Sequence, residues 1–98
     1  MKKENQRDKF FQLCGENDKK ILLGEEKMSF VDFERLFYLA EYFGFEDYSL
    51  EFWNEYAGAF EEELSTVADV QRLDETQILK EEERKNRWRK EFLDEQIK

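Results

Sequence analysis

The sequence contains 98 residues with a net charge of −9; 42% of the residues are charged and 40% are apolar, and a chain of this length usually supports a single hydrophobic core. It contains no histidine, no proline and only one cysteine, Cys14. Imidazole catalysis, histidine metal sites and intrachain disulfides are therefore excluded, and we expect a non-catalytic protein without a cofactor or metal.

The sequence predicts one all-α domain over residues 1–98, a bundle of about four helices, because proline is absent and β-branched residues are scarce. Residues 1–28 are expected to form an N-terminal arm with a short helix over residues 6–14. Gly15 is expected to end this helix, and the Gly-Glu-Asn-Asp sequence that follows is typical of a turn. Residues 21–23 fit either a helical turn or a short extended piece.

A helical hairpin is predicted over residues 29–64. Ser29 is a favourable N-cap residue with Asp32 three positions later, and Gly44 is placed to end the first helix in the left-handed conformation. Ser49 is the expected N-cap of the second helix, which would continue to about residue 64. Because only about five residues separate the two helices, they are expected to be antiparallel. The second helix is expected to bury Leu50, Trp53, Tyr56, Ala57, Phe60 and Leu64.

Residues 65–98 are expected to form a long, charged C-terminal helix, and the sequence allows a kink near residues 73–76. Residues 80–87 include no apolar side chain, so this part of the helix cannot pack in a core. Glutamate and lysine or arginine four residues apart would stabilise it, at a few tenths of a kcal/mol for each pair. Apolar residues return from Trp88 onward.

The negative charge is concentrated in the centre of the chain. Residues 1–35 and residues 72–98 each balance eight basic against eight acidic residues, whereas residues 36–71 contain nine acidic residues and no lysine or arginine. Ten of the sixteen aromatic residues also lie in this central segment. We therefore predict an acidic partner-binding surface made of Glu41, Glu46, Asp47, Glu51, Glu55, Glu61, Glu62, Glu63 and Asp69.

Two details favour binding over a charged face that is merely solvated, which is the alternative. Residues 61–63 are three glutamates expected at the C-terminal end of a helix, where carboxylates cost about 0.3–1 kcal/mol each. Gly58 lies within the predicted carboxylate stripe, although glycine weakens a helix interior. A close helix crossing through residues 57–59 is the alternative explanation for this glycine.

A rigid acidic surface can replace nucleic acid on a protein whose binding channel is lined with lysine and arginine. One helix carries charge less densely than duplex DNA, so both hairpin helices and their links would have to contribute to one face. We therefore predict a small inhibitor that blocks the basic nucleic-acid-binding surface of a partner protein, as DNA-mimic phage inhibitors of restriction or CRISPR effectors do. The likeness is of composition and size only, and no motif places the chain in a named family.

The alternative function is a structural or assembly adaptor that acts through the C-terminal helix. Residues 84–90 carry five positive charges around Trp88, but three glutamates precede them, which disfavours direct nucleic-acid binding. Two such helices could pair antiparallel in a homodimer, or one could dock a partner protein. The competing possibility is that Trp88 and Phe92 pack on the core of their own chain. The residues expected in the contact are Arg84, Arg87, Trp88, Phe92 and Leu93.

The sequence contains no feature typical of export or membrane insertion. No apolar stretch follows the N-terminal lysines, and no apolar run approaches the roughly 18 residues of a membrane span. With a single thiol in addition, we expect a cytoplasmic protein. Cys14 is expected to be buried as a small apolar residue.

Overall fold

The computed structural model describes the backbone of residues 5–69 and 75–97 and the side chains of residues 5–66 and 75–96. Within these ranges the chain is helical and contains no β-strand, which confirms the predicted all-α class. In chain order the elements are α1 (Gln6–Leu13), α2 (Glu16–Leu22), α3 (Phe30–Tyr42), α4 (Glu46–Tyr56), the short 3-10 helix η1 (Ala57–Phe60), α5 (Glu61–Asp69) and α6 (Glu75–Ile97).

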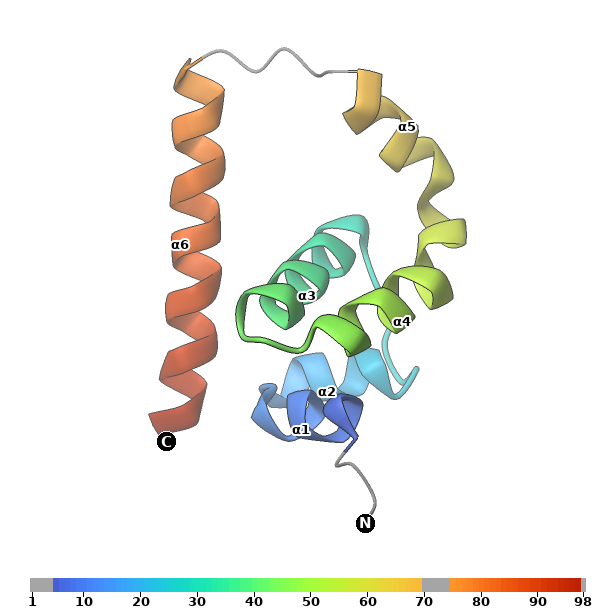
Figure 1. Cartoon of the computed structure of the whole chain (residues 1–98), viewed down its shortest axis with the longest axis vertical. Helices are drawn as coiled ribbons and strands as arrows, with labels where there is room; N and C mark the ends of the chain where they lie inside the picture. The colour runs from blue at the N-terminus through green and yellow to red at the C-terminus, as the bar shows by residue number, and fades with distance from the viewer. Residues whose placement is uncertain (1–4, 70–74, 98) are drawn as a thin grey trace.

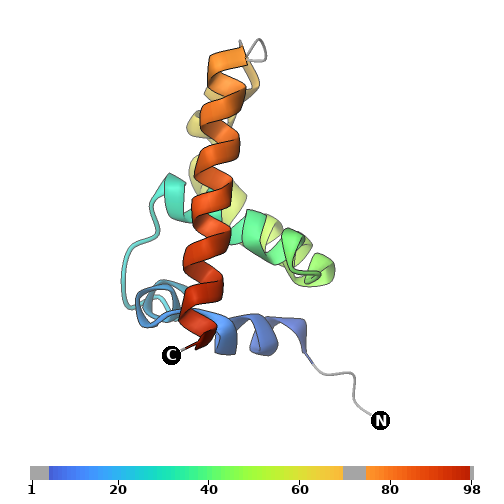
Figure 2. The ribbon, with the colours of Figure 1, turned by 90° about the vertical axis from the view of Figure 1, so that its left-hand side faces the viewer.

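Helix α3 occupies the centre of the molecule (Figure 1). It contacts α4 on one side and α6 on the other, and α1 contacts both α4 and α6. Helices α4, η1 and α5 follow one another in an arc, whereas α6 is a long rod whose C-terminal end reaches α1 (Figures 1 and 2). Among the described helices, none combines the length and the apolar character that a membrane crossing needs.

Aromatic side chains form most of the core. The ring centroid of Phe33 on α3 lies 5.5 Å from that of Phe52 and 5.1 Å from that of Phe60. Phe10 on α1 stacks on Phe92 of α6 with 5.6 Å between the centroids. Aromatic pairs of this kind contribute about 0.5–1.5 kcal/mol beyond the area they bury. Ring packing therefore holds α6 against the rest of the chain.

The predicted ends of α3 are confirmed. The Oγ of Ser29 accepts a hydrogen bond from the Asp32 N–H at 3.1 Å, and the Asp32 carboxylate accepts one from the Ser29 N–H at 3.2 Å, which makes a reciprocal capping box. Gly44 follows α3 with a φ of 90°. The N–H of Phe45 then donates to the Ala40 carbonyl at 2.8 Å, which closes a Schellman turn.

The N-terminal arm is more helical than the sequence predicted. Gly15 is the N-cap of α2, so the expected Gly-Glu-Asn-Asp turn is wrong. The alternative left open for residues 21–23 resolves as helical, because α2 continues through the first two of them and Leu23 is its C-cap. Gly24 follows with a φ of 81°. Asp18 on α2 pairs with Arg35 on α3. This contact lies between distant parts of the chain, so the local pattern could not reveal that α2 is held in place.

The prediction that Ser49 caps the second helix is wrong. Helix α4 begins at Glu46, and Ser49 lies buried inside it, where its Oγ donates to the Glu46 carbonyl at 2.7 Å. The Schellman turn after Gly44 leads almost directly into α4, so only residues 43–45 separate it from α3. Inside a helix, a serine hydroxyl can donate its hydrogen bond to a carbonyl of the preceding turn without capping the helix.

The predicted buried face of the second helix is only partly right. Leu50 is 65% exposed and Trp53 is 37% exposed, whereas Tyr48 and Phe52 are buried in their place. The later members of that face do pack against the core as predicted; these are Tyr56, Ala57, Phe60 and Leu64. The tighter turn of η1 changes the phase between α4 and α5, so one continuous helical face does not describe both.

The break at η1 also overturns one of the two details that favoured a functional acidic stripe. Residues 61–63 occupy the first turn of α5 rather than the end of a helix, and the macrodipole stabilises carboxylates there. A methyl group added at Gly58 would meet no atom within 4 Å. The alternative explanation for this glycine, a close helix crossing, is therefore wrong. The expected kink near residues 73–76 involves residues outside the described part of the chain.

Candidate functional site

The predicted acidic surface is exposed wherever its side chains are described. The Asp69 side chain lies outside the described part. The other eight carboxylates are all exposed, and we call them the acidic surface: Glu41, Glu46, Asp47, Glu51, Glu55, Glu61, Glu62 and Glu63.

The acidic surface has no counter-ions among the side chains that the structure describes. Among the residues with described side chains, no lysine or arginine nitrogen lies within 4.0 Å of any of its eight carboxylates. Arg35 is engaged instead by Asp18 and Asp32. Arg84 is engaged by Glu81, at 2.6 Å, and by Glu34, at 3.9 Å. The charge of the acidic surface is therefore available to a partner.

Three basic residues of α6 lie over aromatic rings. The guanidinium carbon of Arg84 is 4.9 Å from the Trp88 ring centroid, and that of Arg89 is 4.7 Å from the Tyr42 centroid. The Nζ of Lys85 lies 5.4 Å from the Tyr38 centroid. Cation–π contacts thus fix three of these cations to α3 and α6.

The fold brings acidic residues from different helices together. Glu41 near the end of α3 and Glu46 at the start of α4 line the same surface hollow, which also includes Tyr42 and Leu50. On α4 all four carboxylates are exposed, whereas Phe52 is buried. Helix α5 continues the arc of α4 and carries three more carboxylates in its first turn (Figure 1).

The structure contradicts part of the contact predicted for the C-terminal helix. Trp88 and Phe92 are each only 8% exposed, and the ring centroid of Phe92 lies 4.9 Å from that of Phe43. The interpretation in which these two side chains seal a homodimer is wrong, because α6 uses them to attach to its own core. Arg87 and Leu93 from the same predicted contact are exposed.

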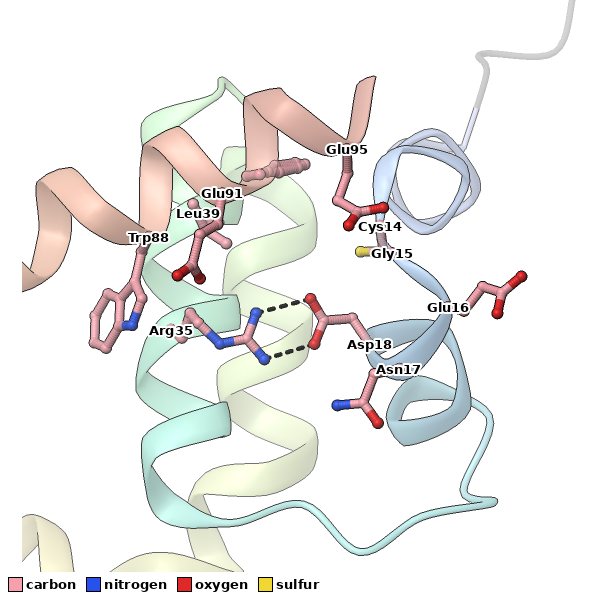
Figure 3. A pocket seen from close by; sticks show the side chains of 11 residues that line it. Cys14, Gly15, Glu16, Asn17, Asp18, Arg35, Leu39, Trp88, Glu91 and Glu95 are labelled. Atoms are coloured by element: carbon pink, nitrogen blue, oxygen red, sulfur yellow. Dashed lines mark hydrogen bonds and ion pairs between the residues drawn. The ribbon is translucent and has the colours of Figure 1, made fainter. Parts of the chain in front are cut away.

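A pocket of about 390 Å³ lies where α1, α2, α3 and α6 meet (Figure 3). The Arg35 guanidinium points across it and is hydrogen-bonded to Asp18. Cys14 lines the pocket and is buried, as predicted. Burial, and then the nearby Asp18 carboxylate, raises the pKa of the Cys14 thiol to about 12. The thiol therefore stays protonated at neutral pH. Beside it, the Arg35–Asp18 pair joins α3 to α2.

Among the described residues, no group of three or more cysteine, aspartate and glutamate side chains has an arrangement that could hold a metal ion. The acidic surface is thus a dispersed set of charges on neighbouring helices, and its carboxylates do not converge on one point. Such a set is suited to contact an extended surface.

The sequence did not reveal an aromatic groove beside the acidic surface. It has a volume of about 230 Å³, and we call it the aromatic groove. Helices α3, α4, α5 and α6 all contribute to its walls, which include Glu34, Phe37, Tyr38, Glu41, Trp53, Leu64 and Lys85. Because these residues come from four helices, only the tertiary structure brings them together.

Fold and site together define a small all-α protein with an unneutralised acidic surface. Comparisons of the chain with protein-family models, with curated proteins and with solved structures give no match. The proposals below therefore depend on the geometry and charge of this chain alone.

Proposed function

We propose that this protein is a non-catalytic inhibitor that blocks the basic nucleic-acid-binding surface of a partner protein. The observation that carries the proposal is the acidic surface, whose eight carboxylates are exposed and lack counter-ions among the described side chains. In this proposal the protein binds neither nucleic acid nor membrane, and acts in the cytoplasm by occupying the place of a polyanion.

The physical support is electrostatic. A net charge of −9 concentrated on one part of a small chain attracts a basic surface and speeds encounter by about 10- to 1,000-fold when the charges are complementary. Each exposed ion pair contributes only about 0–1 kcal/mol, so several must form together. Binding should therefore weaken steeply as salt concentration rises.

Apolar side chains beside the carboxylates would supply contact area. Tyr42 and Leu50, from the hollow that Glu41 and Glu46 line, are more than half exposed, and Trp53 is also exposed. Aromatic residues are enriched at the centres of protein interfaces, and charged residues lie around them.

Nucleic-acid competition tests the proposal. The immobilised protein would capture partners from an extract of the source organism, and duplex DNA or RNA would then be added. We expect nucleic acid to release the captured protein, and raised salt to do the same. Retention of the captured protein at saturating DNA and RNA would contradict the proposal.

Two triple variants with the same change in charge locate the binding site. Replacing Glu61, Glu62 and Glu63 with glutamine should weaken binding at least tenfold, since three charge contacts are lost. The matched control replaces Glu75, Glu82 and Glu83 on α6, which are also exposed, and should weaken binding much less. Equal losses in both variants would mean that only the net charge matters.

The alternative, an adaptor acting through α6, is favoured by one observation. Ile78 and Leu79 are 47% and 63% exposed on the first half of α6, where residues 75–80 are all exposed. Changing both to serine should abolish partner capture under this alternative and leave it intact under the main proposal. Deleting residues 79–98 would not separate the two, because it removes Trp88 and Phe92 from the core.

A further inference from the structure

The aromatic groove lies directly beside the acidic surface. Glu41 belongs to both, and Trp53 on α4 and Leu64 on α5 form walls of the groove on the helices that carry most of the acidic residues. The ring centroids of Trp53 and Phe37 lie 5.1 Å apart, so one side of the groove is formed by two packed aromatic rings. A partner that covers the acidic surface would therefore also cover the groove.

The groove combines aromatic walls with carboxylates. Phe37 and Trp53 provide aromatic walls, while Glu34 and Glu41 provide oxygen acceptors. A planar, weakly hydrated guanidinium can stack on a ring and pair with a carboxylate at the same time. A lysine ammonium is a compact, strongly hydrated charge and gains less from such a site.

The chain already uses this combination next to the groove. Arg84 lies over the Trp88 ring at 4.9 Å, and its Nη2 is 3.9 Å from the Glu34 carboxylate. Arg89 lies over the Tyr42 ring at 4.7 Å. Arg84 thus lies between a ring and a carboxylate on this side of α3, and Arg89 lies over a ring.

The negative charge of the groove is only partly compensated. Burial raises the pKa of Glu34, and the attraction of Arg84 only partly offsets this, since the two are too far apart for a hydrogen bond. Glu41 has no ion pair among the described side chains. Lys85 lines the groove as well, but its ammonium lies against the Tyr38 ring. An incoming guanidinium would find an acceptor that lacks a close partner.

We propose that the aromatic groove receives an arginine side chain of the basic partner protein, while the acidic surface contacts the partner's other positive charges. This inference rests on the proposed function and names the residue type that gives it selectivity. An arginine fits better than an apolar side chain because carboxylates line the groove, and better than a lysine because the remaining walls are aromatic.

Two peptides of equal charge test the inference with the full-length protein. Hexa-arginine and hexa-lysine would be titrated by calorimetry at low salt. We expect hexa-arginine to bind about five- to tenfold more tightly, the size of a cation–π contribution. The variant Trp53→Leu should weaken the binding of hexa-arginine more than that of hexa-lysine and so reduce this preference to less than twofold.

Nuclear magnetic resonance provides an internal control, because the chain contains only two tryptophans. The indole N–H signal of Trp53, in the groove, should shift on adding hexa-arginine. The signal of Trp88, which is buried in the core, should not. Should Trp53→Leu prove unfolded by circular dichroism, the exposed Glu41→Gln change carries the test and should lower the arginine preference at least twofold.

The outcomes separate the two proposals. Equal binding of both peptides, with no shift of the Trp53 signal, would overturn the arginine groove and leave the acidic surface standing. An arginine preference that survives both variants would also overturn it. If neither peptide bound at low salt, the proposed function itself would be contradicted.

Discussion

Arg35 on α3 holds Asp18 on α2 through two parallel hydrogen bonds, 2.7 Å from Nη1 to Oδ2 and 2.5 Å from Nη2 to Oδ1. Both side chains are mostly buried, and Asp32 supplies a third hydrogen bond at 3.2 Å. This bidentate pair joins the N-terminal arm to the central helix, and charge-assisted pairs of this kind are stronger than neutral hydrogen bonds.

Replacing Asp18 with asparagine should lower the free energy of unfolding by about 2 kcal/mol, because Arg35 would lose its main partner while remaining largely buried. Urea unfolding followed by circular dichroism measures this. Glu26→Gln, an exposed change in the loop after α2, is the control and should stay within about 0.5 kcal/mol of the wild type. Equal stability of all three proteins would show that the pair does not stabilise the fold.

The glycines at positions 44 and 58 should respond differently to alanine. Gly44 has a φ of 90°, where an alanine side chain is strained, so Gly44→Ala should destabilise the protein by about 1 kcal/mol or more. Gly58→Ala meets open space in η1 and should be neutral or stabilising by up to about 1 kcal/mol. Thermal unfolding of both variants checks the difference. Substantial destabilisation by Gly58→Ala would reveal a constraint at that glycine that the structure does not contain.

Glu34→Gln should stabilise the protein at pH 7 and have little effect at about pH 3.5. Burial raises the pKa of Glu34 in the folded chain above its ordinary value of 4.5, so the folded state favours the protonated form. The resulting stability is present below the unfolded pKa and is lost as pH rises through the folded pKa. Glutamine mimics the protonated side chain at every pH. Unfolding free energies at both pH values test this; a variant that is less stable at pH 7 would mean that the attraction to Arg84 outweighs burial.

Cys14 should resist alkylation in the folded protein. Burial raises the pKa of its thiol to about 12, so almost no thiolate exists at pH 8, and the side chain is only slightly exposed. Mass spectrometry after iodoacetamide treatment should detect little modification of the native protein. The same protein in concentrated denaturant should react at the rate of a free thiol. Equally fast labelling of the native protein would mean that the packing around Cys14 and Arg35 opens readily.

The ends of α3 were predictable because they depend on near neighbours. The capping box of Ser29 with Asp32 spans three residues, and the turn at Gly44 needs only a residue that tolerates a positive φ. The start of α4 was not predictable in the same way. Serine is a favourable N-cap residue, but the turn at Gly44 lets α4 begin at Glu46. Ser49 therefore lies inside the helix.

The sequence pattern could not predict which residues cover the apolar face of α6. Trp88 and Phe92 fit an intermolecular contact and a core equally well, and the structure places both in the core. The deciding neighbours are Phe10, Phe43 and Tyr38, from parts of the chain more than 40 residues away. An amphipathic pattern identifies an apolar face but does not identify what covers it.

By itself, the sequence determined the helical class, the caps of the central helix and the concentration of negative charge in residues 36–71, because propensity, capping and charge are properties of local composition. Only the tertiary structure decided which charges lack counter-ions, where Trp88 lies and that four helices enclose an aromatic groove. These features depend on distances between residues far apart in the chain, and such distances are set by how the helices pack.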